Sequence, residues 1–160
     1  MKNFVLSVLA FVVLFSSCVK KTGGRACSYD ACATVAPIAE QNNVEAYLTS
    51  KSIVAAKHCS GLFYKIDVAG TGTNPTACSD VSVKYKGTLT NGNIFDQSTT
   101  SISFNIQQLI TGWKNAIPLI KEGGKITLFL PPSLGYGAQA TGSIPANSIL
   151  IFEIELLKVL

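Results

Sequence analysis

The sequence predicts an α+β fold in which mostly antiparallel strands surround one short helix. Residues 81–89 alternate apolar and polar side chains, and an Asn-Gly pair follows with the chemistry of a tight hairpin turn. Residues 113–120 carry three large apolar side chains at helical spacing. The apolar runs 125–130 and 149–159 come after this helix, so predicted strands lie on both sides of it along the chain.

The chain begins with the pattern of an export signal. Lys2 precedes an apolar run over residues 4–15, and the small residues Ser16 and Ser17 close it. A positive start, an apolar core and small residues before a break are typical of a secretory signal peptide. The run is shorter than the roughly 20 residues that a membrane-spanning helix needs. We therefore predict that residues 1–17 are a signal peptide.

Cys18 directly follows the two small residues, and this arrangement resembles the lipobox of bacterial lipoproteins. The resemblance implies cleavage before Cys18 and acylation of its thiol and its new amino group, which would anchor the protein to a membrane. Phe15 stands where the lipobox usually has leucine, so cleavage by signal peptidase I without lipidation is the alternative. Residues 18–33 are then expected to form a lipidated tether.

Four cysteines remain after the lipobox cysteine, and an even number is typical of disulfide-bonded exported domains. Of the three pairings, we favour Cys27 with Cys32 and Cys59 with Cys78, because the second bond would tie two strand regions together. A zinc site is the weaker alternative, since the spacings do not match paired Cys-x-x-Cys ligands. The single histidine stands beside only one of the cysteines. We therefore expect no metal.

Residues 34–58 are interpreted as a helical adaptor ahead of the main domain. Pro37 suits a first helical turn, and apolar residues form an imperfect stripe across residues 40–50. This segment is too short to be a separate domain. We expect its helix to dock on the sheet, with a dimer contact as the alternative.

Short strands are predicted where the periodicity changes toward two, over residues 53–56 and 62–68. Residues 70–75 have the composition of a loop. The Gly-x-Gly pattern in this loop lacks the third glycine and the following helix that a nucleotide-binding motif requires.

The middle of the chain predicts a hairpin followed by the central helix. A polar segment at residues 97–100 separates two short strands, and a glycine pair ends the helix over residues 113–120. Trp113, the only tryptophan, is expected to form the floor of a pocket. The alternative is that Trp113 is an ordinary core aromatic.

Composition narrows the functional classes. A chain of 160 residues, 48% hydrophobic and 14% charged, fits one small folded domain with an extension and argues against disorder. The net charge of +4 is small and scattered, whereas nucleic-acid binding requires clustered basic residues. From residue 59 onward the chain has no histidine and no carboxylate cluster, which disfavours a metal-dependent or nucleophilic enzyme.

A set of short motifs occurs in a fixed order in the second part of the chain. The motifs are Val83-Lys84-Tyr85-Lys86-Gly87, Gly92 with Phe95-Asp96, Ile110-Thr111-Gly112-Trp113, Ile126 to Pro131, Leu134-Gly135-Tyr136-Gly137, Ile144-Pro145, and Leu150 to Leu157. Together they resemble the FKBP-type peptidyl-prolyl cis-trans isomerases. The resemblance implies that residues 59–160 form an FKBP-like domain, an antiparallel twisted sheet wrapped around a short central helix, which rotates X-Pro peptide bonds.

The resemblance also assigns residues to the pocket that receives the substrate proline. The catalytic group is Asp96, Tyr85, Phe95, Trp113, Tyr136 and Phe152. The substrate-binding group is Phe104, Leu109, Ile110 and Ile144, the last in a loop that overhangs the pocket. Tyr136 would hold a substrate carbonyl, and Asp96 would orient Tyr85 or interact with the twisted amide.

The chemistry of the reaction agrees with this assignment. Rotation about X-Pro crosses a barrier of about 18–20 kcal/mol because it destroys amide resonance, and no bond is hydrolysed. Such a catalyst needs a dry aromatic pocket rather than a nucleophile, a metal or any other cofactor. From composition alone, Asp96 is also a candidate turn-capping residue, Tyr85 and Phe95 are candidate core residues, and Tyr136 is a candidate loop tyrosine.

Three positions depart from the family pattern. Ile102 stands where many members have an aromatic residue, segment 139–143 is shortened, and Ala146 replaces a frequent second proline. These departures bear on substrate preference and inhibitor affinity rather than on the fold.

These observations predict a monomeric, lipid-anchored isomerase of the cell envelope that faces the periplasm and assists the folding of exported proteins. Its expected partners are proline-containing unfolded or extended polypeptides, the membrane and macrolide inhibitors, but not nucleic acid. The main alternative is a proline-binding chaperone module with weak catalysis, which the shortened overhang favours. A third is a structural envelope lipoprotein whose pocket is filled by its own side chains.

Overall fold

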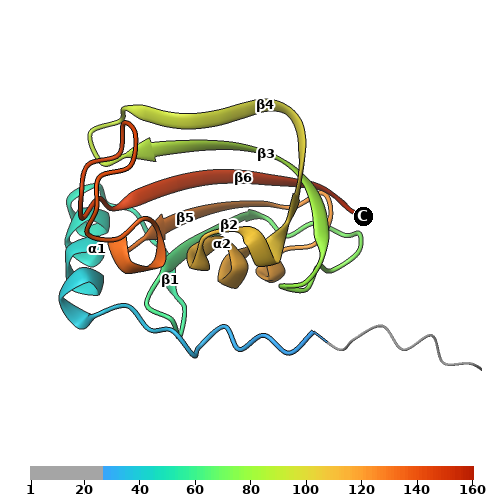
Figure 1. The fold of residues 1–160 in the computed structure, drawn as a ribbon, viewed down its shortest axis with the longest axis horizontal. Coiled ribbons are helices and arrows are strands. Elements are labelled where there is room, and N and C mark those ends of the chain that lie inside the picture. The colour runs from blue at the N-terminus through green and yellow to red at the C-terminus, as the bar shows by residue number, and fades with distance from the viewer. Residues whose placement is uncertain (1–26) are drawn as a thin grey trace, which may run out of the picture.

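A computed structural model describes residues 27–160 of the protein (Figure 1). The predicted signal peptide, Cys18 and the first part of the tether lie outside the described residues. Within residues 27–160, no helix has both the length and the apolar character needed to cross a membrane.

In the described part of the chain, six strands form one sheet in the spatial order β1-β2-β5-β6-β3-β4, and every neighbouring pair is antiparallel. The strands are β1 (Ala56–Lys57), β2 (Phe63–Val68), β3 (Asp80–Leu89), β4 (Ile94–Asn105), β5 (Lys125–Leu130) and β6 (Leu150–Val159). The last strand, β6, lies between β3 and β5, so the end of the chain completes the middle of the sheet. The predicted α+β fold is confirmed.

Helices lie on both faces of this sheet (Figure 1). They are α1 (Ile38–Ser50), η1 (Ile106–Gln108), α2 (Thr111–Ala116), η2 (Ile117–Leu119) and η3 (Pro132–Leu134), the η elements being 3-10 turns. The helix predicted over residues 113–120 is divided between α2 and η2. Pro118 has no N–H to donate to the preceding turn, which accounts for the change from α-helical to 3-10 geometry there.

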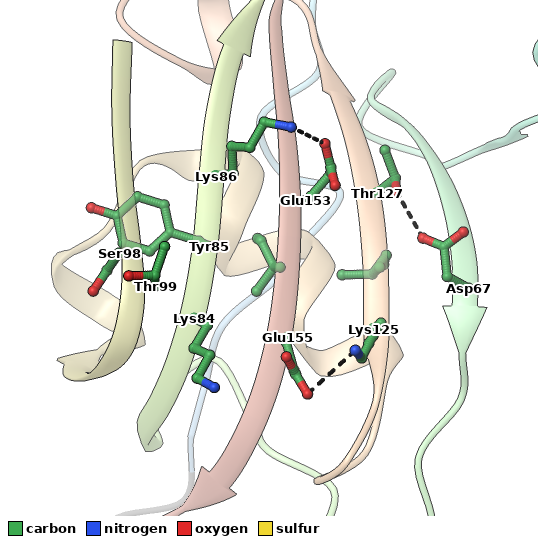
Figure 2. A pocket seen from close by; sticks show the side chains of 12 residues that line it. Asp67, Lys84, Tyr85, Lys86, Ser98, Thr99, Lys125, Thr127, Glu153 and Glu155 are labelled. Carbon is green, nitrogen blue, oxygen red and sulfur yellow. Dashed lines mark hydrogen bonds and ion pairs between the residues drawn. The ribbon is translucent and has the colours of Figure 1, made fainter. Parts of the chain in front are cut away.

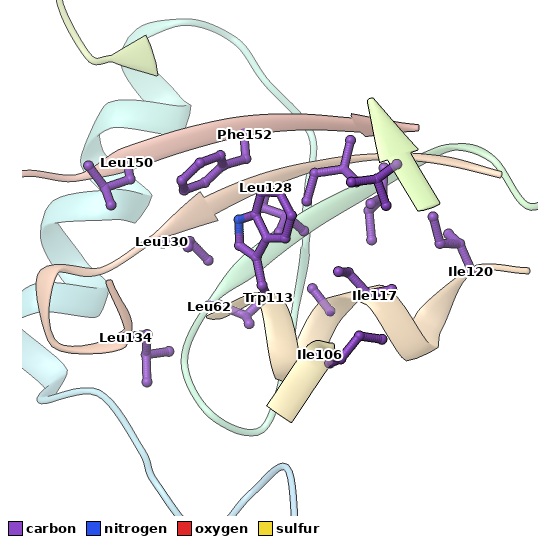
Figure 3. Close-up of a cluster of buried hydrophobic side chains, with 14 of the residues drawn as sticks. Leu62, Ile106, Trp113, Ile117, Ile120, Leu128, Leu130, Leu134, Leu150 and Phe152 are labelled. Carbon is purple, nitrogen blue, oxygen red and sulfur yellow. The ribbon is translucent and has the colours of Figure 1, made fainter. Parts of the chain in front are cut away.

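The main core lies between α2 and the sheet (Figure 3). A second cluster on the other face joins Val44 and Leu48 of α1 to Phe63 and Phe129. Successive side chains of a strand point to opposite faces, so Leu128 faces the main core while Phe129 faces α1. The adaptor helix therefore docks on the sheet, as the sequence analysis expected.

Two strand predictions differ from the structure. The strand expected over residues 53–56 is reduced to β1, because Ile53 and Ala55 pack against the second cluster instead. The polar segment 97–100 does not interrupt the hairpin: β4 is one strand with a register shift opposite β3 between Val83 and Tyr85. Backbone pairing with β3 does not depend on side-chain polarity, and a polar edge strand is compatible with solvent. The turn before β4 has Gly92 at φ +89°, as the Asn-Gly pair predicts.

The disulfide pairing that the sequence analysis favoured is wrong. Cys27 bonds to Cys78, with Cα atoms 5.7 Å apart, and Cys32 bonds to Cys59, with Cα atoms 5.5 Å apart. The segment after Cys27 runs across the domain instead of turning back on itself: the N–H of Ala36 donates to the Ser60 carbonyl at 2.9 Å. Two such bonds indicate an oxidising compartment and therefore export.

We expect each disulfide to stabilise the domain by constraining the unfolded chain. Loop-closure entropy for the separations of 51 and 27 residues gives about 4 kcal/mol for Cys27–Cys78 and about 3.5 kcal/mol for Cys32–Cys59. Guanidinium unfolding of the oxidised protein and of each double serine variant measures these losses.

Thiol titration checks the pairing independently. The variant Cys27→Ser/Cys78→Ser should retain the Cys32–Cys59 bond, so neither of these two thiols reacts. The matched control, Cys27→Ser/Cys32→Ser, should expose two reactive thiols at Cys59 and Cys78. The reverse pattern would contradict the pairing.

Candidate active site

A cavity of about 330 Å³ opens on the face of the sheet that α2 covers. Its lining is Tyr85, Asp96, Phe104, Gln108, Leu109, Ile110, Trp113, Tyr136 and Phe152. The structure thus brings together eight of the ten residues that the sequence analysis assigned to a pocket. A cavity of this size suits a small ligand or one side chain with its flanking backbone.

Trp113 lies at the base of this cavity and is only 4% exposed. Its indole stands nearly perpendicular to the rings of Tyr85 and Phe152, each with its centroid 5.2 Å away, and to that of Phe104 at 6.1 Å. Such edge-to-face contacts stabilise aromatic clusters beyond simple burial. Trp113 is also part of the main core (Figure 3). It is therefore both the floor of a cavity and a core aromatic residue.

The close approach of α2 to β5 depends on Gly112. A Cβ atom at this position would lie 2.5 Å from Cδ1 of Leu130, which is shorter than any normal contact. Ile110 caps the helix, and its carbonyl accepts from the N–H of Trp113 at 3.0 Å. The glycine before the tryptophan therefore sets how deep the indole lies.

The polar part of the cavity is a hydrogen-bonded pair. The hydroxyl of Tyr85 on β3 donates to Oδ2 of Asp96 on β4 at 2.6 Å. Burial, then the hydrogen bond to Asp96 and its charge, raise the pKa of Tyr85 to about 12. Burial and then the charge of Asp96 also raise the pKa of Tyr136. Both phenols therefore stay protonated at neutral pH and can donate hydrogen bonds.

Two predicted residues do not line the cavity. Phe95 is partly buried at the border of the main core and packs edge-on against Phe152, with ring centroids 5.4 Å apart at 88°. Ile144 is 6% exposed and packs in the main core. Its N–H and C=O bond reciprocally with the backbone of Thr141 at 2.9 Å, so residues 141–144 form a tight turn.

Gln108 lines the cavity, but the sequence analysis did not identify it. It ends η1, which leads directly into the lining residues Leu109 and Ile110. The sequence signal that could have identified Gln108 is its position next to two predicted pocket residues.

A larger groove of about 520 Å³ lies on the opposite face of the sheet (Figure 2). Its charges largely neutralise one another: Lys86 pairs with Glu153 at 3.0 Å and Lys125 with Glu155 at 3.4 Å. These pairs are exposed and contribute little energy individually. The aromatic cavity, although smaller, holds the residues suited to binding an apolar ring.

The raised pKa of Tyr85 leads to a spectroscopic prediction. Tyr85→Phe removes one of five tyrosines, so the difference between the absorbance titrations of protein and variant isolates this phenol. We expect its midpoint near pH 12, above the value of about 10 for an unperturbed tyrosine. Because the folded-state pKa is raised, the associated stability is fully present below about pH 10 and is lost as the pH rises through about 12. Asp96→Asn should lower the midpoint, and an unchanged midpoint would contradict the contribution of Asp96.

A family model described as FKBP-type peptidyl-prolyl cis-trans isomerase matches residues 72–157, which include all ten predicted pocket residues. FkpA of Buchnera aphidicola subsp. Schizaphis graminum is 46% identical over 108 residues, which cover 65% of this chain and 43% of that relative. FkpA of Escherichia coli strain K12 is 45% identical over 103 residues, which cover 62% and 38% of the two chains. The match thus spans less than half of the length of these relatives.

Solved structures agree in fold. The crystal structure of a peptidyl-prolyl cis-trans isomerase from Pseudomonas syringae pv. tomato has a TM-score of 0.67 and 33% identity, and the match covers 79% of this chain and 98% of that one. The crystal structure of FkpA from Escherichia coli has the same TM-score and 38% identity, with 76% and 58% covered. The aromatic cavity, the fold and these matches lead to one conclusion: the chain belongs to the FKBP-type peptidyl-prolyl cis-trans isomerase family.

Proposed function

We propose that this protein is an active peptidyl-prolyl isomerase that rotates X-Pro bonds in exported or envelope polypeptides. The observation that carries the proposal is the hydrogen bond between Tyr85 and Asp96. It lies at the edge of an apolar cavity that has Trp113 at its base. This arrangement offers an aromatic surface for the pyrrolidine ring and polar groups for the adjoining amide.

The geometry suggests how the barrier falls. A planar amide is more polar than a twisted one, so an apolar pocket disfavours the planar ground state relative to the transition state. The protonated phenols of Tyr85 and Tyr136 can donate to substrate carbonyls, and the Asp96 carboxylate holds the first phenol in place. Asp96 itself is exposed enough to meet the twisted amide.

The location of the protein belongs to the same proposal. The two disulfides support export, and the lipobox-like Cys18 supports a lipid anchor in the cell envelope, with the domain facing the periplasm. Its substrates would be unfolded or extended chains with an apolar residue before proline. Macrolide inhibitors are proposed ligands of the same cavity.

The test is isomerisation of a short Leu-Pro peptide by the oxidised protein that begins after Cys18, beside its Asp96→Ala variant. Acceleration that falls in the variant supports the proposal. If the folded protein binds the peptide without accelerating it, the chaperone module becomes the better description. The open cavity argues against the third alternative, a pocket filled by its own side chains.

A further inference from the structure

Helix α1 contacts the segment that carries a cavity residue. Oε2 of Glu40, in the first turn of α1, accepts a hydrogen bond from the backbone N–H of Ser133 at 2.9 Å. Ser133 belongs to η3, which begins at Pro132 and is preceded by Pro131. The first N–H groups of a helical turn have no partner within the turn, and proline has none to offer, so Glu40 serves the first N–H of η3.

Backbone hydrogen bonds to the start of η3 also fix the two residues on either side of Tyr136. The carbonyl of Pro132 accepts from the N–H of Gly135 at 2.9 Å and from that of Gly137 at 2.8 Å, the two residues that flank Tyr136. Leu134 is fully buried in the main core, whereas Tyr136 is 41% exposed and lines the cavity. The position of η3 therefore determines where the phenol of Tyr136 stands at the mouth of the cavity.

The position of Glu40 is fixed by contacts that other residues of α1 make. Val44 and Leu48 fix α1 on the sheet. Nε2 of Gln41 donates to the Ala36 carbonyl at 2.6 Å, and this buried bond secures the start of the helix. The carboxylate consequently comes from a docked helix rather than from a free surface loop.

We infer that Glu40 is a positioning residue of the active site, which holds η3 and thereby Tyr136 against the cavity. The helical adaptor, which lies outside the residues that the family model matches, would thus contribute to substrate binding. This inference rests on the proposed function, since Tyr136 must bind substrate for its position to matter.

Steady-state kinetics with a Leu-Pro peptide test the inference on the full-length protein. Glu40→Ala should raise KM about three- to tenfold with kcat nearly unchanged, because a charge-assisted hydrogen bond is lost away from the reacting amide. Glu40→Gln keeps an acceptor and should restore most of the affinity. Glu45→Ala, an exposed glutamate of the same helix, is the matched control and should leave KM unchanged.

A double-mutant cycle separates positioning from general destabilisation. In the Tyr136→Phe background, Glu40→Ala should add little to KM, whereas two independent effects would multiply. Full multiplication, or an unchanged KM in Glu40→Ala, overturns the inference.

Amide hydrogen exchange gives a readout that does not require catalysis. Exchange at Gly135 and Gly137 should become about tenfold faster in Glu40→Ala and stay unchanged in Glu45→Ala, because the turn opens more often. If the parent protein shows no isomerase activity but exchange accelerates, the proposed function fails while the positioning of η3 stands. Unchanged exchange at both glycines overturns the positioning itself.

Discussion

Asp96→Ala lowers kcat/KM for a Leu-Pro peptide by about 10- to 100-fold, because a charge-assisted hydrogen bond is lost at the reacting amide. The substitution leaves the Tyr85 hydroxyl without the acceptor that holds it at 2.6 Å. Among residues 27–160, it also removes the only carboxylate that lines the cavity. Coupled-protease or NMR exchange assays of the peptide measure the loss.

Asp67→Ala is the matched control. Its carboxylate is also exposed and also accepts a hydroxyl bond, from Thr127 at 2.7 Å, but it lies on the opposite face of the sheet. Turnover should therefore be unaffected. Tyr85→Phe should lower turnover, and its effect should not multiply with that of Asp96→Ala, because both remove the same contact. Full activity in Asp96→Ala would refute the site.

Trp113→Ala is expected to cost about 3–5 kcal/mol of the free energy of unfolding and to abolish measurable turnover. Trp113 is 4% exposed and contacts three aromatic rings, so its removal leaves a hole in the main core as well as in the cavity. Small domains are stable by only about 5–15 kcal/mol, so the variant stays folded with a much reduced margin. Urea unfolding and the peptide assay measure the two effects.

Two further variants allow the result for Trp113→Ala to be interpreted. Trp113→Phe keeps much of the buried volume, so it should retain most of the stability while losing part of the turnover. Tyr136→Phe removes only the hydroxyl of a side chain that is 41% exposed and should change stability by less than about 0.5 kcal/mol. A Trp113→Ala protein with unchanged unfolding would mean that the indole is not part of the core.

Under the proposed function, the overlap of the main core with the cavity has a physical reason. An amide-twisting catalyst needs an apolar environment, and the lowest-dielectric place in a small domain is its core. The cavity is a part of the main core that remains open to solvent, with Trp113 and Phe152 belonging to both.

Several elements followed from local patterns in the sequence. Strand β5 has the predicted bounds, Lys125–Leu130, and β3 and β6 lie within one residue of theirs. These strands are buried on one or both faces, so alternation or continuous apolar runs mark them clearly. The ordered motifs likewise located most of the cavity, since family resemblance carries information about distant contacts that periodicity lacks.

Other features depend on contacts between distant residues. The disulfide partners of Cys27 and Cys32 lie 51 and 27 residues away, and spacing alone does not distinguish the three pairings. Ile144 belongs to a recognisable motif, yet a tight turn directs it into the core. The bond from Glu40 to Ser133 spans 93 residues and joins a segment outside the family match to one within it.

The sequence by itself determined the fold class, the central helix and the residue types of the cavity, because short-range periodicity and ordered motifs predict these features. Only the tertiary structure decided the disulfide pairing, the inward turn of Ile144 and the contact between α1 and η3. Each of these features depends on which distant segments the fold brings together. A hydrogen bond or a disulfide forms between groups that are close in space, whatever their separation along the chain, so local sequence patterns do not predict it.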